Sequence, residues 1–163
     1  MARIKDLLQE NLIIEDIKAQ DKPGVLREFA ELITAAGKSR DADEIIRILM
    51  ERESLGSTGI GGGIAIPHGK LPRTSDMIVA FGRSSSGVAY QSMDGEPVYL
   101  FFLLMTPEEN PGEHLKTLAR ISRILKNPTL RENLRNATRR QELQRLIEEE
   151  DGKYPQPHAV SLK

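Results

Sequence analysis

The segment from Val98 to Met105 reads VYLFFLLM, eight apolar residues without a polar residue between them. A strand with one face in water alternates apolar and polar residues, so this run is typical of a central strand covered on both faces. A helix needs about 20 apolar residues to cross a bilayer, so the run is too short for a membrane span. The segment therefore predicts a sheet enclosed between layers of helices.

Helical patterns occur on both sides of this strand. Apolar residues recur at helical spacing over residues 23–36, with Gly37 as the stop. A second helix is predicted from the N-cap Asp41 to Gly56. A third begins after Asn110, which is followed by proline and then by glutamate at the third helical position, and two shorter helices complete the set. These helices supply the predicted covering layers.

The remaining strands are shorter. Residues 77–81 (MIVAF) predict a strand, the serine-rich segment 82–87 predicts a loop after it, and apolar residues in 12–17 predict an edge strand. Helices before and after several strands imply an α/β sandwich in one domain, which we assign to residues 1–150. The last residues, 151–163, contain two prolines and are expected to form a disordered tail.

Composition excludes several classes of function. The net charge is −1, so no global basic field attracts nucleic acid or an anionic membrane. The chain has no cysteine, which excludes disulfides, thiol catalysis and zinc–thiolate sites. The first residues, MARIKDLLQENL, are too charged for a signal peptide. We therefore expect a cytoplasmic protein without nucleic-acid binding or membrane insertion.

Glycine is concentrated in the segment Gly56–Lys70, GSTGIGGGIAIPHGK, which holds six of the 13 glycines and His68. Glycine has no Cβ, so such a run lets backbone N–H groups approach a ligand closely. Residues 64–66 predict a short buried strand, and Pro67 is expected to end the pairing just before the histidine. The sequence thus predicts a glycine platform, a short strand and an imidazole at its exit.

Nucleotide and metal motifs do not fit this segment. A P-loop needs a glycine and a hydroxyl where the chain has Ile64 and Leu71. A dinucleotide fingerprint fails at the same Ile64 and would have to precede a helix. The three histidines share no short ligand spacing, so neither a metal nor another cofactor is expected. A Ser–His–Asp hydrolase stays open by residue count, although no G-x-S-x-G elbow is present.

The remaining interpretation makes His68 itself the nucleophile. A neutral imidazole near pH 7 attacks phosphorus, and its phosphoramidate product is labile enough to pass the group onward. The site must keep one ring nitrogen free, orient the ring through the other, and offer donors to the phosphoryl oxygens, for which glycine amides are candidates. His158, in the expected tail, is interpreted as incidental.

Two helical residues are candidates for supporting roles. Arg52 continues the buried stripe of its helix and could direct its guanidinium at a phosphoryl group, or it could only satisfy the helix dipole. His114 lies in the first turn of the helix after Asn110, where a helix N-terminus disfavours imidazolium. It could be a neutral second histidine of the site or a merely structural one.

At this point the sequence resembles a known family. GSTGIGGGIAIPHGK resembles the active-site signature of type-2 enzyme IIA domains of the bacterial phosphoenolpyruvate-dependent phosphotransferase system, most like the nitrogen-regulatory IIA proteins. The resemblance covers roughly residues 1–150 and implies a mixed sheet flanked by helices. It implies that His68 is the phosphorylated residue, that Arg52 in RESLGSTGI lies beside it, and that His114 in HLKTLARIS is the second histidine. Gly62 departs from relatives that often carry asparagine or another polar residue there.

The resemblance also implies partners. An HPr-like phosphohistidine carrier protein would be the donor, and the acceptor would be a regulated protein or a separate IIB protein. The chain carries no IIB-like or membrane domain, which favours regulation through the phosphorylation state of His68. The alternatives are a sugar-uptake IIA component and a binding module that has lost the transfer. The sequence names neither the regulated partner nor the oligomeric state.

Overall fold

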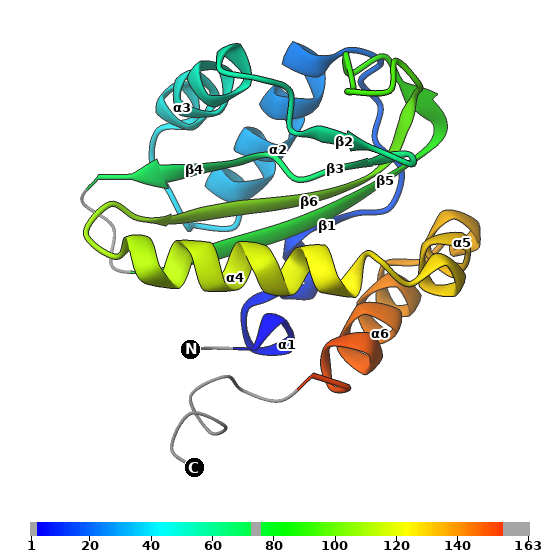
Figure 1. Ribbon diagram of the computed structural model, residues 1–163. Coiled ribbons are helices and arrows are strands. Elements are labelled where there is room, and N and C mark those ends of the chain that lie inside the picture. Colours follow the sequence, from blue (N-terminus) through cyan, green and yellow to red (C-terminus); the bar gives the residue numbers. More distant parts are fainter. Residues whose placement is uncertain (1–2, 73–75, 155–163) are drawn as a thin grey trace.

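The computed structural model describes residues 3–72 and 76–154 and forms one mixed sheet between two layers of helices (Figure 1). The strands are β1 (Ile13–Ile14), β2 (Gly59–Gly61), β3 (Ile64–Ala65), β4 (His68–Leu71), β5 (Ile78–Val88) and β6 (Val98–Pro107). The helices are α1 (Ile4–Leu7), the 3-10 turn η1 (Glu10–Leu12), α2 (Lys22–Ala35), α3 (Ala42–Ser54), α4 (Pro111–Ile124), α5 (Pro128–Asn136) and α6 (Arg140–Asp151). The predicted α/β fold with a mixed sheet between helices is confirmed.

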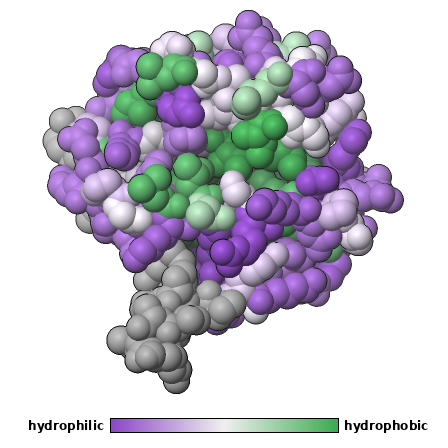
Figure 2. All heavy atoms as spheres, in the orientation of Figure 1, coloured by the Kyte–Doolittle hydropathy of each residue, from purple (hydrophilic) through white to green (hydrophobic). Residues whose placement is uncertain are grey.

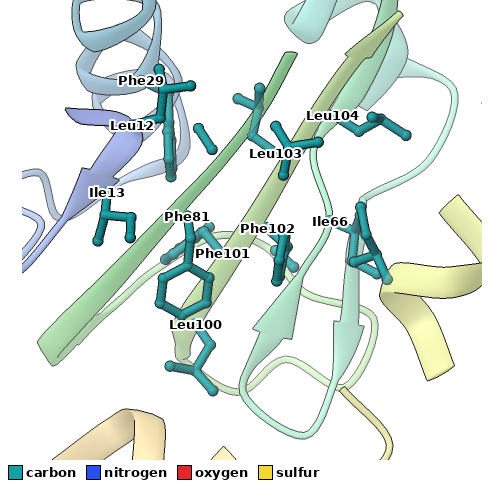
Figure 3. Packing of buried hydrophobic residues seen from close by; sticks show 14 of the residues in the cluster. Leu12, Ile13, Phe29, Ile66, Phe81, Leu100, Phe101, Phe102, Leu103 and Leu104 are labelled. Carbon is teal, nitrogen blue, oxygen red and sulfur yellow. The ribbon is translucent and has the colours of Figure 1, made fainter. Parts of the chain in front are cut away.

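Strand β6 is the centre of the sheet. It pairs antiparallel with β5 and parallel with β3 and β4, in the strand order β1-β5-β6-β3-β2. Every residue of β6 except Tyr99 is buried. Phe101 packs against Phe29 of α2 and against Tyr90, whereas Phe102 packs edge-on against Phe81 (Figure 3). The unbroken apolar run is therefore explained by two buried faces, as predicted.

The helices lie where their caps and apolar stripes place them. Helices α2 and α3 cover one face of the sheet and α4 lies along the other (Figure 1). The side chain of Asp41 accepts the N–H of Glu44, and the side chain of Asn110 accepts the N–H of Glu113. Both predicted N-caps are confirmed. In the part of the chain that the structure describes, no helix has both the length and the apolar character to cross a membrane.

The predicted loop at 82–87 is wrong, because these residues continue β5 to Val88. A Cβ at Gly82 would lie 2.8 Å from atoms of Ile17 and of Phe29, so this glycine is a packing contact inside the strand. The N–H and hydroxyl of Ser85 are both bound by the carboxylate of Asp16. The small residues that resembled a turn are therefore held in a strand by distant parts of the chain, with an irregular register between Arg83 and Val88.

Helix α6 extends into the expected tail. Asp151, its last residue, is fully buried and forms an ion pair with Arg120, and the N–H of Lys5 donates to the same carboxylate at 3.2 Å. Tyr154 follows, and its carbonyl accepts a hydrogen bond from Arg120. Residues 151–154, which the sequence interpretation assigned to the tail, thus belong to the folded unit. Residues 155–163 lie outside the described part of the chain.

Candidate functional site

His68 lies at the beginning of β4. Strand β3 ends at Ala65, and Pro67 then accepts the N–H of Leu104 through its carbonyl. Pairing with β6 resumes at once, with His68 opposite Leu104. The prediction that pairing stops before the histidine is therefore wrong in one respect. Proline removes only a donor, so a parallel ladder on the same neighbour continues after a single break.

Both nitrogens of the His68 ring have a partner. Nδ1 lies 2.7 Å from the carbonyl oxygen of Ile66, and Nε2 lies 3.2 Å from Nε of Arg52. A carbonyl only accepts and a guanidinium only donates, so Nδ1 carries the hydrogen and Nε2 carries the lone pair. Burial lowers the pKa of His68, and the charge of Arg52 lowers it further, against opposing effects of the Ile66 carbonyl and Glu53. The ring is thus a neutral base whose unprotonated nitrogen is Nε2.

Arg52 lies in the last turn of α3 and makes two contacts. Its Nε donates to His68, and its Nη1 donates to the carbonyl of Gly56 at 2.8 Å. The second bond holds the chain just beyond the helix end, as the structural interpretation of this residue expected. The first contact directs the guanidinium at the lone pair of the histidine. Both interpretations left open by the sequence therefore have a contact in the structure.

His114 lies next to His68. The two ring centroids are 5.5 Å apart, and the planes are tilted by 52°. His114 is buried in the first turn of α4, and its Nδ1 lies 2.7 Å from the hydroxyl of Thr106. Burial lowers the pKa of His114 to about 4, with further lowering from the charges of His68 and Lys70. The second ring is therefore also neutral at pH 7, and it too is oriented through its Nδ1.

A buried ionic cluster beneath Arg52 was not predicted. The carboxylate of Glu53 forms an ion pair with Lys22 at 2.9 Å and accepts hydrogen bonds from Thr58 and Tyr90. Burial alone would raise the pKa of Glu53, but the hydrogen bonds from Thr58 and Lys22 outweigh this effect, so the pKa is lowered. Glu53 lies four residues after buried Leu49, and this spacing could have indicated its inward direction. The cluster fixes the chain that leads from α3 to β2.

The glycines do not form the predicted platform around His68. Gly61, Gly62 and Gly63 all have positive φ and make the turn between β2 and β3. In Figure 1 this turn points toward α5, whereas β4 runs to the opposite end of the sheet. The N–H of Gly62 donates to Asp94 at 3.1 Å. Gly69 serves packing, because a Cβ there would lie 2.6 Å from Ile48. These glycines are required by a turn and by a helix–strand contact.

Apolar side chains stand exposed beside the site. Leu55 follows the helix of Arg52 and is 83% exposed, and Leu115 follows His114 and is 66% exposed. Ile60 and Met93 are also exposed, on neighbouring backbone joined by the N–H of Met93 and the carbonyl of Gly59. Figure 2 shows apolar residues gathered in the middle of this face, bordered by hydrophilic ones. Such a surface is typical of contact with another protein.

The site thus contains a neutral imidazole with an unprotonated Nε2, a fixed guanidinium and a second neutral imidazole. Among the described residues, no group of three or more His, Cys, Asp or Glu side chains is arranged to hold a metal ion. An arrangement with one unprotonated ring nitrogen beside a planar set of donors suits transfer of a charged tetrahedral group.

Comparison with known proteins places this geometry in context. The sequence model described as "Phosphoenolpyruvate-dependent sugar phosphotransferase system, EIIA 2" matches residues 6–150. A nitrogen regulatory protein of Bradyrhizobium diazoefficiens is 39% identical over 133 residues, which cover 81% of this chain and 86% of that protein. The fructose-specific EIIABC component of the phosphotransferase system of Bacillus subtilis is 36% identical over 149 residues, which cover 91% of this chain but only 24% of that protein.

A solved structure is also similar. The nitrogen regulatory protein IIA-Ntr of Neisseria meningitidis superimposes with a TM-score of 0.81 at 31% identity, covering 88% of this chain and 98% of that chain. The similarity therefore includes nearly the whole of that protein, in contrast to the fraction of the Bacillus subtilis component that matches.

Proposed function

The chain belongs to the EIIA 2 family of the phosphoenolpyruvate-dependent sugar phosphotransferase system, and on that premise we propose that it is a phosphocarrier whose His68 accepts a phosphoryl group. The donor is a protein that carries phosphohistidine. The observation that carries this proposal is the pairing of the His68 ring: Nδ1 is bound to the carbonyl of Ile66, and Nε2 holds its lone pair beside Arg52.

In the transfer, the lone pair of Nε2 attacks phosphorus as the nitrogen–phosphorus bond of the donor breaks. The bonding electrons return to the imidazole of the donor, and no water takes part. Nδ1 of His68 keeps its hydrogen and its hydrogen bond to the carbonyl of Ile66, and this bond fixes the ring during the exchange. Once Nε2 carries the group, Arg52 loses its acceptor there and can donate to the phosphoryl oxygens instead. His114, also neutral, adds no charge that would compete for the group.

We propose regulation of a partner protein as the use of this transfer. The relatives from Bradyrhizobium diazoefficiens and Neisseria meningitidis, both named nitrogen regulatory proteins, match this chain over most of their length. Phosphorylation adds about two negative charges, beside exposed Leu55 and Leu115. A charge placed next to apolar contacts changes the affinity for a partner without refolding the chain.

A sugar-uptake role is the second candidate, supported by the similarity to the fructose-specific component of Bacillus subtilis. In that case a separate IIB protein takes the phosphoryl group. The two roles differ in one measurable step. If incubation with a IIB protein discharges the phosphorylated chain within seconds, uptake is supported. If the phosphate stays while affinity capture recovers a different partner in only one phosphorylation state, regulation is supported.

The phosphate acceptor is tested directly with a phosphorylated carrier protein and a radioactive label. The wild-type chain is expected to take up one acid-labile, base-stable phosphate, and His68→Ala is expected to take up none. The matched control is His158→Ala, which changes another of the three histidines and should be labelled like the wild type. Equal labelling of His68→Ala would exclude His68 as the acceptor, and an unlabelled wild type would favour a module that only binds.

A further inference from the structure

A cationic pocket, apart from the site of His68, lies at the end of the sheet where the β2–β3 turn meets α5. There, a pocket of about 600 Å³ is lined by Arg83 of β5 and by Arg131 and Arg135 of α5. Gly62 from the turn lines it as well, and so does Glu132, its one carboxylate. The three guanidinium groups and the carboxylate of Glu132 together give this small space a formal charge of +2, in a chain whose net charge is −1.

Each guanidinium is held in place by a neutral group. Nη1 of Arg83 donates to the carbonyl of Arg135 at 2.8 Å, and its Nε donates to the carbonyl of Glu15 at 3.2 Å. Arg131 donates to the carbonyl of Leu125 at 2.8 Å. The guanidinium of Arg135 lies 3.7 Å from the ring centroid of Tyr99, a cation–π distance. The three charges are therefore fixed but not neutralised by these contacts.

Among the described residues, none of the three arginines forms an ion pair with a carboxylate. Two exposed arginines elsewhere do: Arg47 pairs with Glu51 and Arg145 pairs with Glu149. Asp16 lies close enough to Arg83 for the arginine to help lower its pKa, but its oxygens are bound to Ser85. Arg83 is only 7% exposed, so it is a buried charge without a bonded counter-charge.

Such an arrangement is costly until an anion is added. Arg131 and Arg135 are four residues apart on one helix face, where like charges repel. A buried charge that lacks an opposite charge destabilises the fold unless something supplies it. Ser84 also lines the pocket, and its hydroxyl, which accepts the N–H of Gly87, still has a hydrogen to donate. Guanidinium and hydroxyl donors of this kind match the oxygens of a phosphate.

We propose that this pocket binds the phosphoryl group of a small phosphorylated metabolite, or inorganic phosphate, without covalent chemistry. A dianion matches the formal charge of +2. The volume exceeds what a phosphate ion needs and lies within the range of small-molecule sites, so an attached organic group can be accommodated. The pocket is concave and is built from α5, β5 and the β2–β3 turn, so it is separate from His68, Arg52 and His114. The proposed binding of phosphate in this pocket therefore does not depend on phosphorylation of His68.

The binding is tested by titrating the ¹⁵N-labelled chain with inorganic phosphate and, separately, with AMP at constant ionic strength. Saturable shifts are expected at the amides of Gly62, Ser84 and Glu132, which line the pocket. Tighter binding of AMP would identify an organic phosphate as the preferred form, and equal binding would identify the phosphoryl group alone. Shifts that potassium chloride reproduces at the same ionic strength would overturn the proposal, since salt acts on any exposed charge.

The double variant Arg131→Gln/Arg135→Gln removes two of the three charges and should weaken phosphate binding by about tenfold or more. The matched control is Arg145→Gln, an exposed helical arginine outside the pocket, which should bind phosphate like the wild type. Circular dichroism and the melting temperature verify that both variants fold. In addition, phosphate should raise the melting temperature of the wild type and not that of the double variant. Equal affinity of the double variant and the wild type would refute the site.

Discussion

The site around His68 and the pocket of Arg83, Arg131 and Arg135 differ in how their polar groups are paired. Around His68, both nitrogens of its ring have a partner, in Ile66 and Arg52. Nδ1 of His114 lies beside the hydroxyl of Thr106, and the carboxylate of Glu53 pairs with Lys22. In the pocket of Arg83, Arg131 and Arg135, neutral groups hold the guanidiniums and none of them is bonded to a carboxylate in the described residues.

This difference separates a reactive centre from a binding site. At His68, burial and the neighbouring charge keep the imidazole neutral and leave a lone pair directed at Arg52, which is what a nucleophile requires. In the arginine pocket the guanidinium groups stay protonated near pH 7, so they can act neither as nucleophiles nor as bases. On the functions proposed above, the first region forms a bond with phosphorus, whereas the second binds an anion without covalent chemistry.

We expect the largest effect from Arg52→Gln, on the rate of phosphoryl transfer. Glutamine keeps a hydrogen-bond donor but removes the charge and the planar pair of N–H groups directed at Nε2 of His68. We expect the rate of phosphoryl transfer to fall by about 100-fold or more, the usual effect of losing one donor to transition-state charge. Rapid-quench kinetics with a phosphorylated carrier protein would measure it.

The control for this variant is Arg47→Gln on the same helix, where an exposed arginine pairs with Glu51. It removes the same charge from α3 and should leave the transfer rate within about twofold, since exposed pairs contribute little. If Arg52→Gln transferred phosphate as fast as Arg47→Gln, Arg52 would have no role in transfer, and only its structural contact with Gly56 would remain. The comparison between the two regions would then lose its main distinction.

The pH dependence of stability should follow the histidines and not the arginines. The pKa values of His68 and His114 are lower in the fold than in the unfolded chain, that of His114 at about 4. The unfolded state therefore binds protons first as the pH falls below 6.5, and the stability present above that pH is lost toward pH 4. For His114 the full loss is about 3 kcal/mol, since each pKa unit is about 1.4 kcal/mol.

Chemical denaturation between pH 8 and pH 4 would measure this effect as a difference between variants. His114→Gln should lose less stability than the wild type over this range, because glutamine does not titrate. Arg131→Gln/Arg135→Gln should keep the wild-type dependence on pH, because neither side chain changes its charge there. A wild-type slope in His114→Gln would mean that the neutral state of this ring is not set by the fold.

Local signals made much of the fold predictable. The N-caps Asp41 and Asn110 bind backbone N–H groups three residues ahead. The apolar run of β6 indicates burial by itself, without information about its neighbours in the sheet. The strand at 82–87 could not be found this way. Gly82 is small because Ile17 and Phe29 pack against it, and this requirement is invisible without the tertiary contact.

The same distinction between local signals and tertiary contacts applies to the site residues. His68, Arg52 and His114 were named from their local surroundings, and the structure brings their side chains together. The role assigned to the glycines was wrong, because positive φ in a turn and close approach to a phosphate favour the same residue. The arginine pocket gave no signal at all, since Arg83 is separated by 48 residues from Arg131 and meets it only through the packing of α5 on β5.

Thr106→Val should have the smallest effect and tests how much orientation His114 needs. Valine fills the same space in β6 but removes the hydroxyl that lies 2.7 Å from Nδ1 of His114. Leaving a buried ring nitrogen without a partner costs about 1–2 kcal/mol of stability, and the freed ring should slow transfer by about fivefold. The pH profile of transfer should shift as well, because the hydrogen bond to Nδ1 of His114 is lost. Thr106→Ser, which restores the hydroxyl, should recover both rate and profile. If Val and Ser transfer phosphate equally well, the hydroxyl has no part in orienting His114.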